Sequence, residues 1–266
     1  AHMKETPPEY AEASEAYGMA IEACPETDPN KPKYLLEWGD VLLQWAEKDE
    51  RLRQSERLER FLLAQRQYRK ALDYDPNLVE AYTRLLDMAD RMRRIEDIIS
   101  ICDKLMELTP EDHSIRYRWN MARASLVPGQ PETLDPVIKE FRDLVEIAPK
   151  EEKYWLVLGG FLHTYDRKKE AEQAYKDALA ANPDSVSIRV AYAYYLQRLD
   201  RRDEALPILA KVISLQPKKV DGYLVLAKFK IQDGKTDEAV QALNNAVEAD
   251  PVDFQAYALL ARISAS

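Results

Sequence analysis

The stretch EKYWLVLGGFLHTYDRKKEAEQAYKDALAANPDS, residues 152–185, decides the fold. Its apolar residues recur three or four positions apart, which places them on one face of a helix. Two helices are indicated, with apolar faces formed by Trp155, Leu158, Gly159 and Leu162 and by Ala171, Tyr175 and Ala178. Pro183 ends the second helix, because proline lacks an amide hydrogen. Each helix alone would expose its apolar face, so we expect an antiparallel hairpin.

This stretch is one copy of a repeat. Six comparable segments end in proline, and all but one of the intervals between them are equal: Pro76, Pro110, Pro149, Pro183, Pro217 and Pro251. The exception is the interval from Pro110 to Pro149, which is slightly longer. A fixed period of this length indicates stacked helical units, each of which buries its apolar face against its neighbours.

The pattern W-x2-L-G-x2-L, followed by A-x3-Y-x2-A-x4-P, resembles the tetratricopeptide repeat, whose period of about 34 residues equals the common interval. The resemblance covers nearly the whole chain and implies an all-α solenoid of helix hairpins that forms a right-handed superhelix. The expected divisions are an expression-tag scar at 1–3, a half-repeat helix and linker at 4–31, repeats at 32–78, 79–112, 113–151, 152–185, 186–219 and 220–253, and a capping helix at 254–266.

Two repeats are longer than the rest. The repeat at 32–78 contains a long insertion, and the segment 47–70 around it is rich in helix formers. We therefore expect both of its helices to be lengthened. The repeat at 113–151 contains a shorter insertion near Pro128 and Gly129, which indicates a longer turn between its helices. In the capping helix, Tyr257 and Leu260 are expected to cover the last hairpin.

Composition excludes several classes of protein. The chain is 46% hydrophobic, too apolar for disorder, and no apolar run is long enough to span a membrane, so we expect a soluble chain. The net charge of -9 argues against a nucleic-acid binder. Two cysteines are too few for a disulfide framework. The opening Ala-His-Met resembles a cloning scar, which leaves the native N-terminus, any signal peptide and the localisation open.

No catalytic or cofactor motif appears: the sequence has no Gly-rich phosphate loop, no Cys/His ligand set and no nucleophile motif. We therefore expect neither an enzyme nor a cofactor. Asp40, Asp87 and Asp90 are weighed as a metal site, but a solvated acidic face fits them better, since hard cations need more oxygen ligands. Cys102 takes a core position and His163 is better explained as polar lining than as a general base.

The resemblance also implies a concave groove lined by the first helix of each repeat, at its positions 2, 5, 9, 12 and 13. The residues predicted to line it are Tyr117, Met121, Leu156, Gly160, His163, Val190, Tyr194, Gln197, Leu224, Lys228 and Ile231. An acidic end is predicted at Asp40, Glu80, Asp87 and Asp90. Exposed apolar patches mark interaction sites, and the alternative is that these apolar residues are packed. The Lys and Asn that clamp the carboxylate of chaperone tails are missing from the corresponding positions.

Two functions follow from these patterns. The first is a scaffold that binds a partner peptide or helix in the groove, the partner being amphipathic with a basic flank. The alternative is a structural building block, a homo-oligomer or part of a larger chain, that associates through the ends of its array. Both are protein-binding roles, and they differ in the surface that is used.

Overall fold

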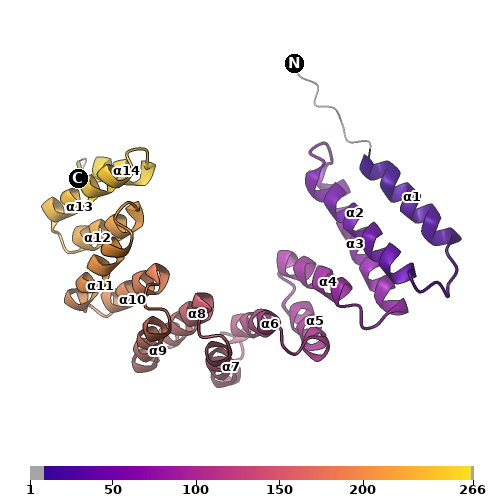
Figure 1. Ribbon diagram of the computed structural model, residues 1–266, viewed down its shortest axis with the longest axis horizontal. Helices are drawn as coiled ribbons and strands as arrows, with labels where there is room; N and C mark the ends of the chain where they lie inside the picture. Colours follow the sequence, from indigo (N-terminus) through magenta and orange to yellow (C-terminus); the bar gives the residue numbers. More distant parts are fainter. Residues whose placement is uncertain (1–8, 265–266) are drawn as a thin grey trace, which may run out of the picture. The chain divides into compact units, whose positions relative to one another are not determined.

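The computed structural model describes residues 9–264 and divides into two compact units, residues 1–133 and 134–266 (Figure 1). The described residues form fourteen α-helices and one short 3-10 helix, and they contain no strand. The predicted all-α fold is confirmed. The tag scar at 1–3 lies outside the described residues. The division falls in the long turn of the repeat predicted at 113–151, so the two helices of that repeat belong to different units.

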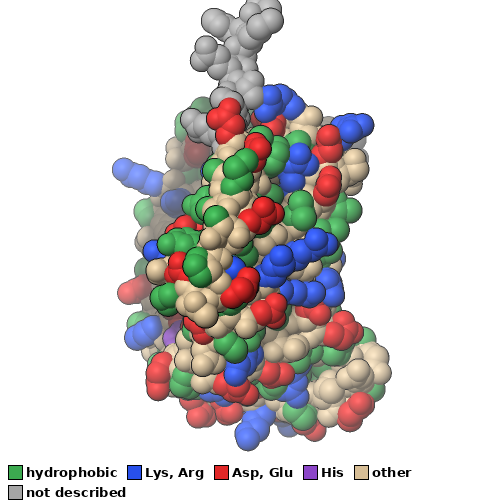
Figure 2. Space-filling model, turned by 90° about the vertical axis from the view of Figure 1, so that its right-hand side faces the viewer, with side chains coloured by type: hydrophobic (Ala, Val, Ile, Leu, Met, Phe, Trp, Pro, Cys, Tyr) green, Lys and Arg blue, Asp and Glu red, His purple; other side chains and the backbone are tan. Residues whose placement is uncertain are grey.

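The first unit is built from paired helices. Its elements are α1 (Glu9–Ala23), α2 (Lys31–Lys48), α3 (Gln54–Tyr74), α4 (Val79–Met92), α5 (Ile95–Leu108), α6 (His113–Leu126) and the 3-10 helix η1 (Pro131–Thr133). The pairs α2 with α3 and α4 with α5 pack as predicted, and α1 packs on α2. Figure 2 views the molecule from the side on which α1 lies, and apolar and acidic side chains run along this helix.

The long pair α2 and α3 confirms the expected effect of the first insertion. These helices contain 18 and 21 residues, whereas α4 to α6 contain 14 each. Arg57 of α3 donates hydrogen bonds to the carbonyl oxygens of Ala46 at 3.1 Å and Asp49 at 2.7 Å, in the last turn of α2 and just after it. A cation there compensates the partial negative charge of a helix C-terminus. The Arg60 guanidinium lies 3.9 Å from the Trp45 ring centre, which adds a cation-π contact between the two helices.

The second unit continues the same arrangement. Its helices are α7 (Leu134–Ile147), α8 (Glu152–Thr164), α9 (Lys168–Ala181), α10 (Val186–Arg198), α11 (Arg202–Leu215), α12 (Val220–Gln232), α13 (Thr236–Ala249) and α14 (Phe254–Ser264). The hairpins are α8 with α9, α10 with α11 and α12 with α13, and α10 contacts both α8 and α12. The three first helices of these hairpins therefore lie side by side (Figure 1).

Two glycines allow helices to approach closely. A Cβ atom at Gly159 of α8 would lie 2.6 Å from the ring of Tyr175, and one at Gly39 of α2 would lie 2.4 Å from the ring of Tyr68. Both distances are too short for any side chain. The small residue and the aromatic residue thus form one packing device, used in both units. Cys102 is fully buried as predicted, and burial raises the pKa of its thiol to about 12.

The tight turns between paired helices share one backbone feature. Asp166, Asp200 and Gly234 have φ angles of 59°, 60° and 70°, in the left-handed region, and they occupy the same position in three successive repeats. Arg93 has the same conformation between α4 and α5, with φ 53°. A left-handed residue after a helix lets the next backbone amide bond back to the helix end. One turn geometry therefore joins all four hairpins.

The C-terminal helix docks with a different face from the one predicted. Tyr257 was expected to cover the last hairpin, but 47% of it is exposed, whereas Ala256 is fully buried. Leu259, Leu260 and Ile263 are partly buried and pack on the cluster formed by α12 and α13. The helix is rotated relative to the expectation, so that Ala256 and Leu260, four residues apart, share the docked face. Leu260 is placed correctly, and the prediction for Tyr257 is wrong.

Candidate functional site

The predicted groove residues of the second unit lie on α8, α10 and α12, the three first helices that run side by side. On α8, Leu156 is half-buried, and a Cβ atom at Gly160 would meet nothing within 4 Å. The missing side chain leaves open space beside Leu156 on the same helical face. This part of the surface offers apolar contact without a protruding side chain.

His163 closes the end of this face on α8. Its ring packs edge-on against Tyr195 of α10, with the ring centres 5.3 Å apart. Burial lowers the pKa of His163, and the nearby positive charges of Arg198 and Lys168 lower it further. Both effects favour the neutral imidazole. Its buried Nδ1 atom has no hydrogen-bond partner among the described residues.

On α10, Val190 and Tyr194 are half-buried, and the ring of Tyr194 packs against Phe229 of α12 at a centroid distance of 5.6 Å. Burial raises the pKa of the Tyr194 phenol. Gln197 donates a hydrogen bond to the Gln232 side chain at the end of α12. These contacts hold the aromatic and polar groups in fixed positions before any partner arrives.

On α12, the placement of Leu224 corrects the sequence analysis. Its side chain is only 4% exposed and belongs to the core cluster with Ala227, Leu243 and Ala256. Because α14 packs on α12 as well as on α13, it covers the position that would otherwise face a partner. Leu224 is therefore a packing residue. Lys228 is exposed and Ile231 is half-buried on the same helix.

Tyr117 and Met121 of α6 lie in the first unit. They line a cavity of about 320 Å³ together with residues of α4 to α6 and of the turn before α5: Asp90, Arg93, Ile95, Ile98, Arg118, Ala122 and Ser125. Met121 is 39% exposed, and burial raises the pKa of Tyr117. These two residues thus belong to a small cavity of their own unit.

The predicted acidic end is largely neutralised by the chain itself. Asp40 accepts hydrogen bonds from the Tyr68 hydroxyl at 2.8 Å and from Arg84 Nε at 2.8 Å. Arg118 bridges Asp87, at 2.9 Å, and Asp90. Glu80 is exposed. Three of the four carboxylates therefore have an arginine partner within the chain.

The sequence carries a signal for these pairs that was missed. Arg84 and Arg118 both stand at position 6 of their repeats, which are adjacent, and each pairs with an aspartate at position 9 of the repeat before it. The groove positions implied by the resemblance are 2, 5, 9, 12 and 13, so the arginines at position 6 were not considered. A search for opposite charges at a fixed offset between successive repeats would have found the ladder.

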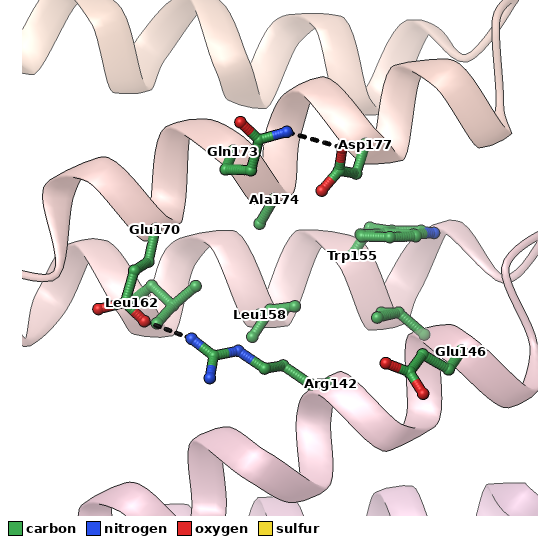
Figure 3. A pocket seen from close by; sticks show the side chains of 10 residues that line it. Arg142, Glu146, Trp155, Leu158, Leu162, Glu170, Gln173, Ala174 and Asp177 are labelled. Atoms are coloured by element: carbon green, nitrogen blue, oxygen red, sulfur yellow. Dashed lines mark hydrogen bonds and ion pairs between the residues drawn. The ribbon is translucent and has the colours of Figure 1, made fainter.

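A second surface escaped the sequence analysis: a cavity of about 400 Å³ between α7, α8 and α9 (Figure 3). Its lining consists of Arg142, Val145, Glu146, Trp155, Leu158, Leu162, Glu170, Gln173, Ala174 and Asp177. Trp155, which the sequence places on the apolar face of this helix, forms a wall of the cavity. Its indole is held by a hydrogen bond from Nε1 to the Pro149 carbonyl oxygen at 2.9 Å.

Residues 9–264 contain neither a candidate membrane span nor a candidate metal cluster. None of the described helices is long and apolar enough to cross a membrane. No three His, Cys, Asp or Glu side chains in that range lie close enough together to hold a metal ion.

Comparison with known proteins supports the repeat pattern. Residues 196–263 match the family model described as tetratricopeptide repeat. Among solved structures, a tetratricopeptide repeat protein from Parabacteroides merdae is 14% identical, with a TM-score of 0.55, over 97% of this chain and 93% of that one. YrrB, described as a TPR protein with an unusual peptide-binding site, is 18% identical over 72% and 96% of the two chains, with a TM-score of 0.46.

MamA is 17% identical over 65% of this chain and 92% of its own, with a TM-score of 0.49. A search of curated proteins finds no match. At these identities the likeness to the Parabacteroides protein shows the fold alone.

Proposed function

We propose that this chain, of which residues 196–263 match the tetratricopeptide-repeat model, is a protein-interaction scaffold that binds an apolar segment of a partner on α8, α10 and α12. The proposal is carried by a row of half-buried apolar side chains on these helices: Leu156, Val190, Tyr194 and Ile231. Open space at Gly160 lies beside this row. Such a surface gains from being covered, since its apolar groups still meet water. A helix with apolar residues on one side fits side-by-side helices best.

A basic flank on the partner is the electrostatic part of the proposal. It would meet Glu80 and the carboxylates Asp40, Asp87 and Asp90. Because Arg84 and Arg118 already pair with three of these groups, we expect the flank to contribute little. Its contribution is measured as the affinity lost between low and high salt. The proposal assigns binding and no catalysis, in keeping with a sequence without a phosphate-loop or nucleophile motif.

The test uses Gly160→Glu, which adds a carboxylate to this face. The substitution should not disturb packing, because a Cβ atom at Gly160 would have no neighbour within 4 Å. Peptides selected from a random library on the wild-type chain are synthesised and titrated against both proteins. We expect binding to weaken at least about tenfold, because the carboxylate must be desolvated against an apolar segment.

The matched control is Ala180→Glu, which adds the same charge at an exposed position of α9. It should leave binding unchanged. Peptides that bind Gly160→Glu as well as they bind the wild type would show that this face is not the site.

A second candidate function, self-association, is favoured by one observation. Large apolar side chains lie open at and just before the last helix: Val252 is 87%, Phe254 80% and Tyr257 47% exposed. A second copy stacked on this surface would cover them. Light scattering distinguishes the two candidates, since a chain that self-associates through this surface should become monomeric when Phe254 and Tyr257 are changed to serine.

A further inference from the structure

The cavity between α7, α8 and α9 is divided into two ends of different charge (Figure 3). At one end, Glu170 of α9 is paired with Arg142 of α7 and also lies 3.4 Å from Arg167. At the other end, the Trp155 ring is seen edge-on, with the carboxylate of Asp177 on the α9 side of its plane and that of Glu146 on the α7 side. The first end is neutralised by the chain itself.

The end beside Trp155 keeps its negative charge. Asp177 accepts a hydrogen bond from the neutral amide of Gln173 at 2.8 Å. Neither Glu146 nor Asp177 has an ion-pair partner among the described residues. A carboxylate beside an indole face attracts a cation, because the ring face carries partial negative charge.

The interior of the cavity is apolar. Leu158, Leu162 and Ala174 form its floor, between the charged ends. Its volume of about 400 Å³ lies in the range of about 300–1,000 Å³ usual for ligand sites. A long aliphatic stem with a cationic head matches this order of groups, with the stem over the leucines and the head at Trp155.

The next hairpin shows why the space is open here. The residue that corresponds to Leu158 in the following repeat is Tyr192, whose ring stacks on Tyr175 at a centroid distance of 5.6 Å. There the tyrosine ring and the ion pair of Glu172 with Arg201 occupy the space between the helices. Leucine in place of tyrosine leaves the corresponding volume empty between α7 and α9.

The charges differ in the same way. One repeat further along the chain, the residues that correspond to Glu146 and Asp177 are Ala180 and Lys211. The next hairpin therefore has no carboxylate at either position. Between α7, α8 and α9, an open volume, an indole wall and carboxylates without basic partners occur together.

We propose that this cavity binds an arginine side chain of a partner polypeptide, with its guanidinium on the face of Trp155 beside Asp177. Arginine is preferred to lysine because a planar guanidinium stacks on an indole and pairs with carboxylates through two hydrogen bonds. The proposal rests on the proposed function only in taking a polypeptide as ligand. Trp155, Leu158 and Leu162 occupy a different face of α8 from Leu156 and Gly160.

The experiment titrates the full chain with the peptide acetyl-Leu-Arg-Leu-amide and with the same peptide containing citrulline, which keeps the shape of arginine without its charge. The indole N–H signal of Trp155, identified by its loss in Trp155→Phe, reports binding in heteronuclear NMR spectra. We expect a saturable shift with the arginine peptide and an affinity at least about tenfold weaker with citrulline.

Two variants carry residues that the next hairpin tolerates at the same register: Leu158→Tyr fills the cavity and Asp177→Lys reverses the charge. Each should abolish the shift or weaken binding at least about tenfold. Circular dichroism and the remaining indole signals check that both variants fold. If a substitution itself changes the Trp155 signal in a folded variant, the affinity of that variant is measured by calorimetry instead.

Gly160→Glu should leave this binding intact, so that failure here is separable from failure of the proposed function. The proposal is overturned if the arginine peptide produces no saturable shift, if citrulline binds equally well, or if a folded Leu158→Tyr protein binds as the wild type does. Equal binding of a lysine peptide would overturn the preference for arginine and support a general basic-side-chain site.

Discussion

Gly159 and Gly160 are adjacent in sequence and opposite in role. A side chain at Gly159 would collide with the ring of Tyr175, whereas one at Gly160 would extend into open space. The repeat pattern predicts the first role, because the pattern places a small residue opposite an aromatic one. It cannot predict the second, since the space around a surface residue depends on how neighbouring helices are spaced.

Alanine substitutions should separate the two glycines. Gly159→Ala is expected to lower the free energy of unfolding by about 1–3 kcal/mol through overpacking. Gly160→Ala is expected to raise it by about 0.5–1 kcal/mol, because glycine inside a helix costs backbone entropy. Urea denaturation followed by circular dichroism measures both. Equal shifts of the two midpoints would contradict the packing described for Tyr175.

Helix α14 shows what a sequence pattern predicts at the scale of an element. The existence of the helix and the contact of Leu260 follow from the repeat, but Tyr257 is exposed and Ala256 takes the buried place. Similarly, Leu224 was assigned to the groove because its position in the repeat faces a partner. The docking of α14 on α12 decides otherwise, and contacts between elements are not encoded in the period of either one.

Removing α14, by ending the chain after Asp253, should expose the apolar cluster that contains Leu224, Leu243 and Ala246. We expect the free energy of unfolding to fall by about 2 kcal/mol or more, or the protein to associate. The control is Tyr257→Glu, which should unfold at the wild-type midpoint because the side chain is exposed. Wild-type stability of the shortened chain would mean that α14 does not dock.

At the scale of the molecule, the number and order of helices could be predicted from the sequence, because prolines and small residues recur at fixed intervals. The ion-pair ladder of Arg84 and Arg118 and the cavity at Trp155 could not be predicted from one repeat alone. The ladder arises from charges that recur at a fixed offset between successive repeats, and the cavity arises from a difference between successive repeats at one register. The division of the chain between residues 133 and 134 coincides with the insertion near Gly129, which the sequence did indicate.

The turn at this division should tolerate added length. We expect a Gly-Ser-Gly-Ser segment inserted after Gly129, which is exposed, to change the unfolding midpoint little, since lengthening a loop costs little entropy. The same insertion after Asp166 should lower the midpoint clearly, because it interrupts the tight left-handed turn that holds α8 against α9 within one unit. Thermal unfolding compares the two, and equal losses would contradict the division into units.

The left-handed turn residues at Asp166, Asp200 and Gly234 also bear on how such a chain changes over generations. They are evenly spaced along the chain, and each joins its helices with the same geometry. An in-frame duplication or loss of the codons between two of these turns would therefore recreate an intact junction on both sides. The gene can lengthen or shorten by whole hairpins, and the surface offered to partners can be extended without inventing a new connection.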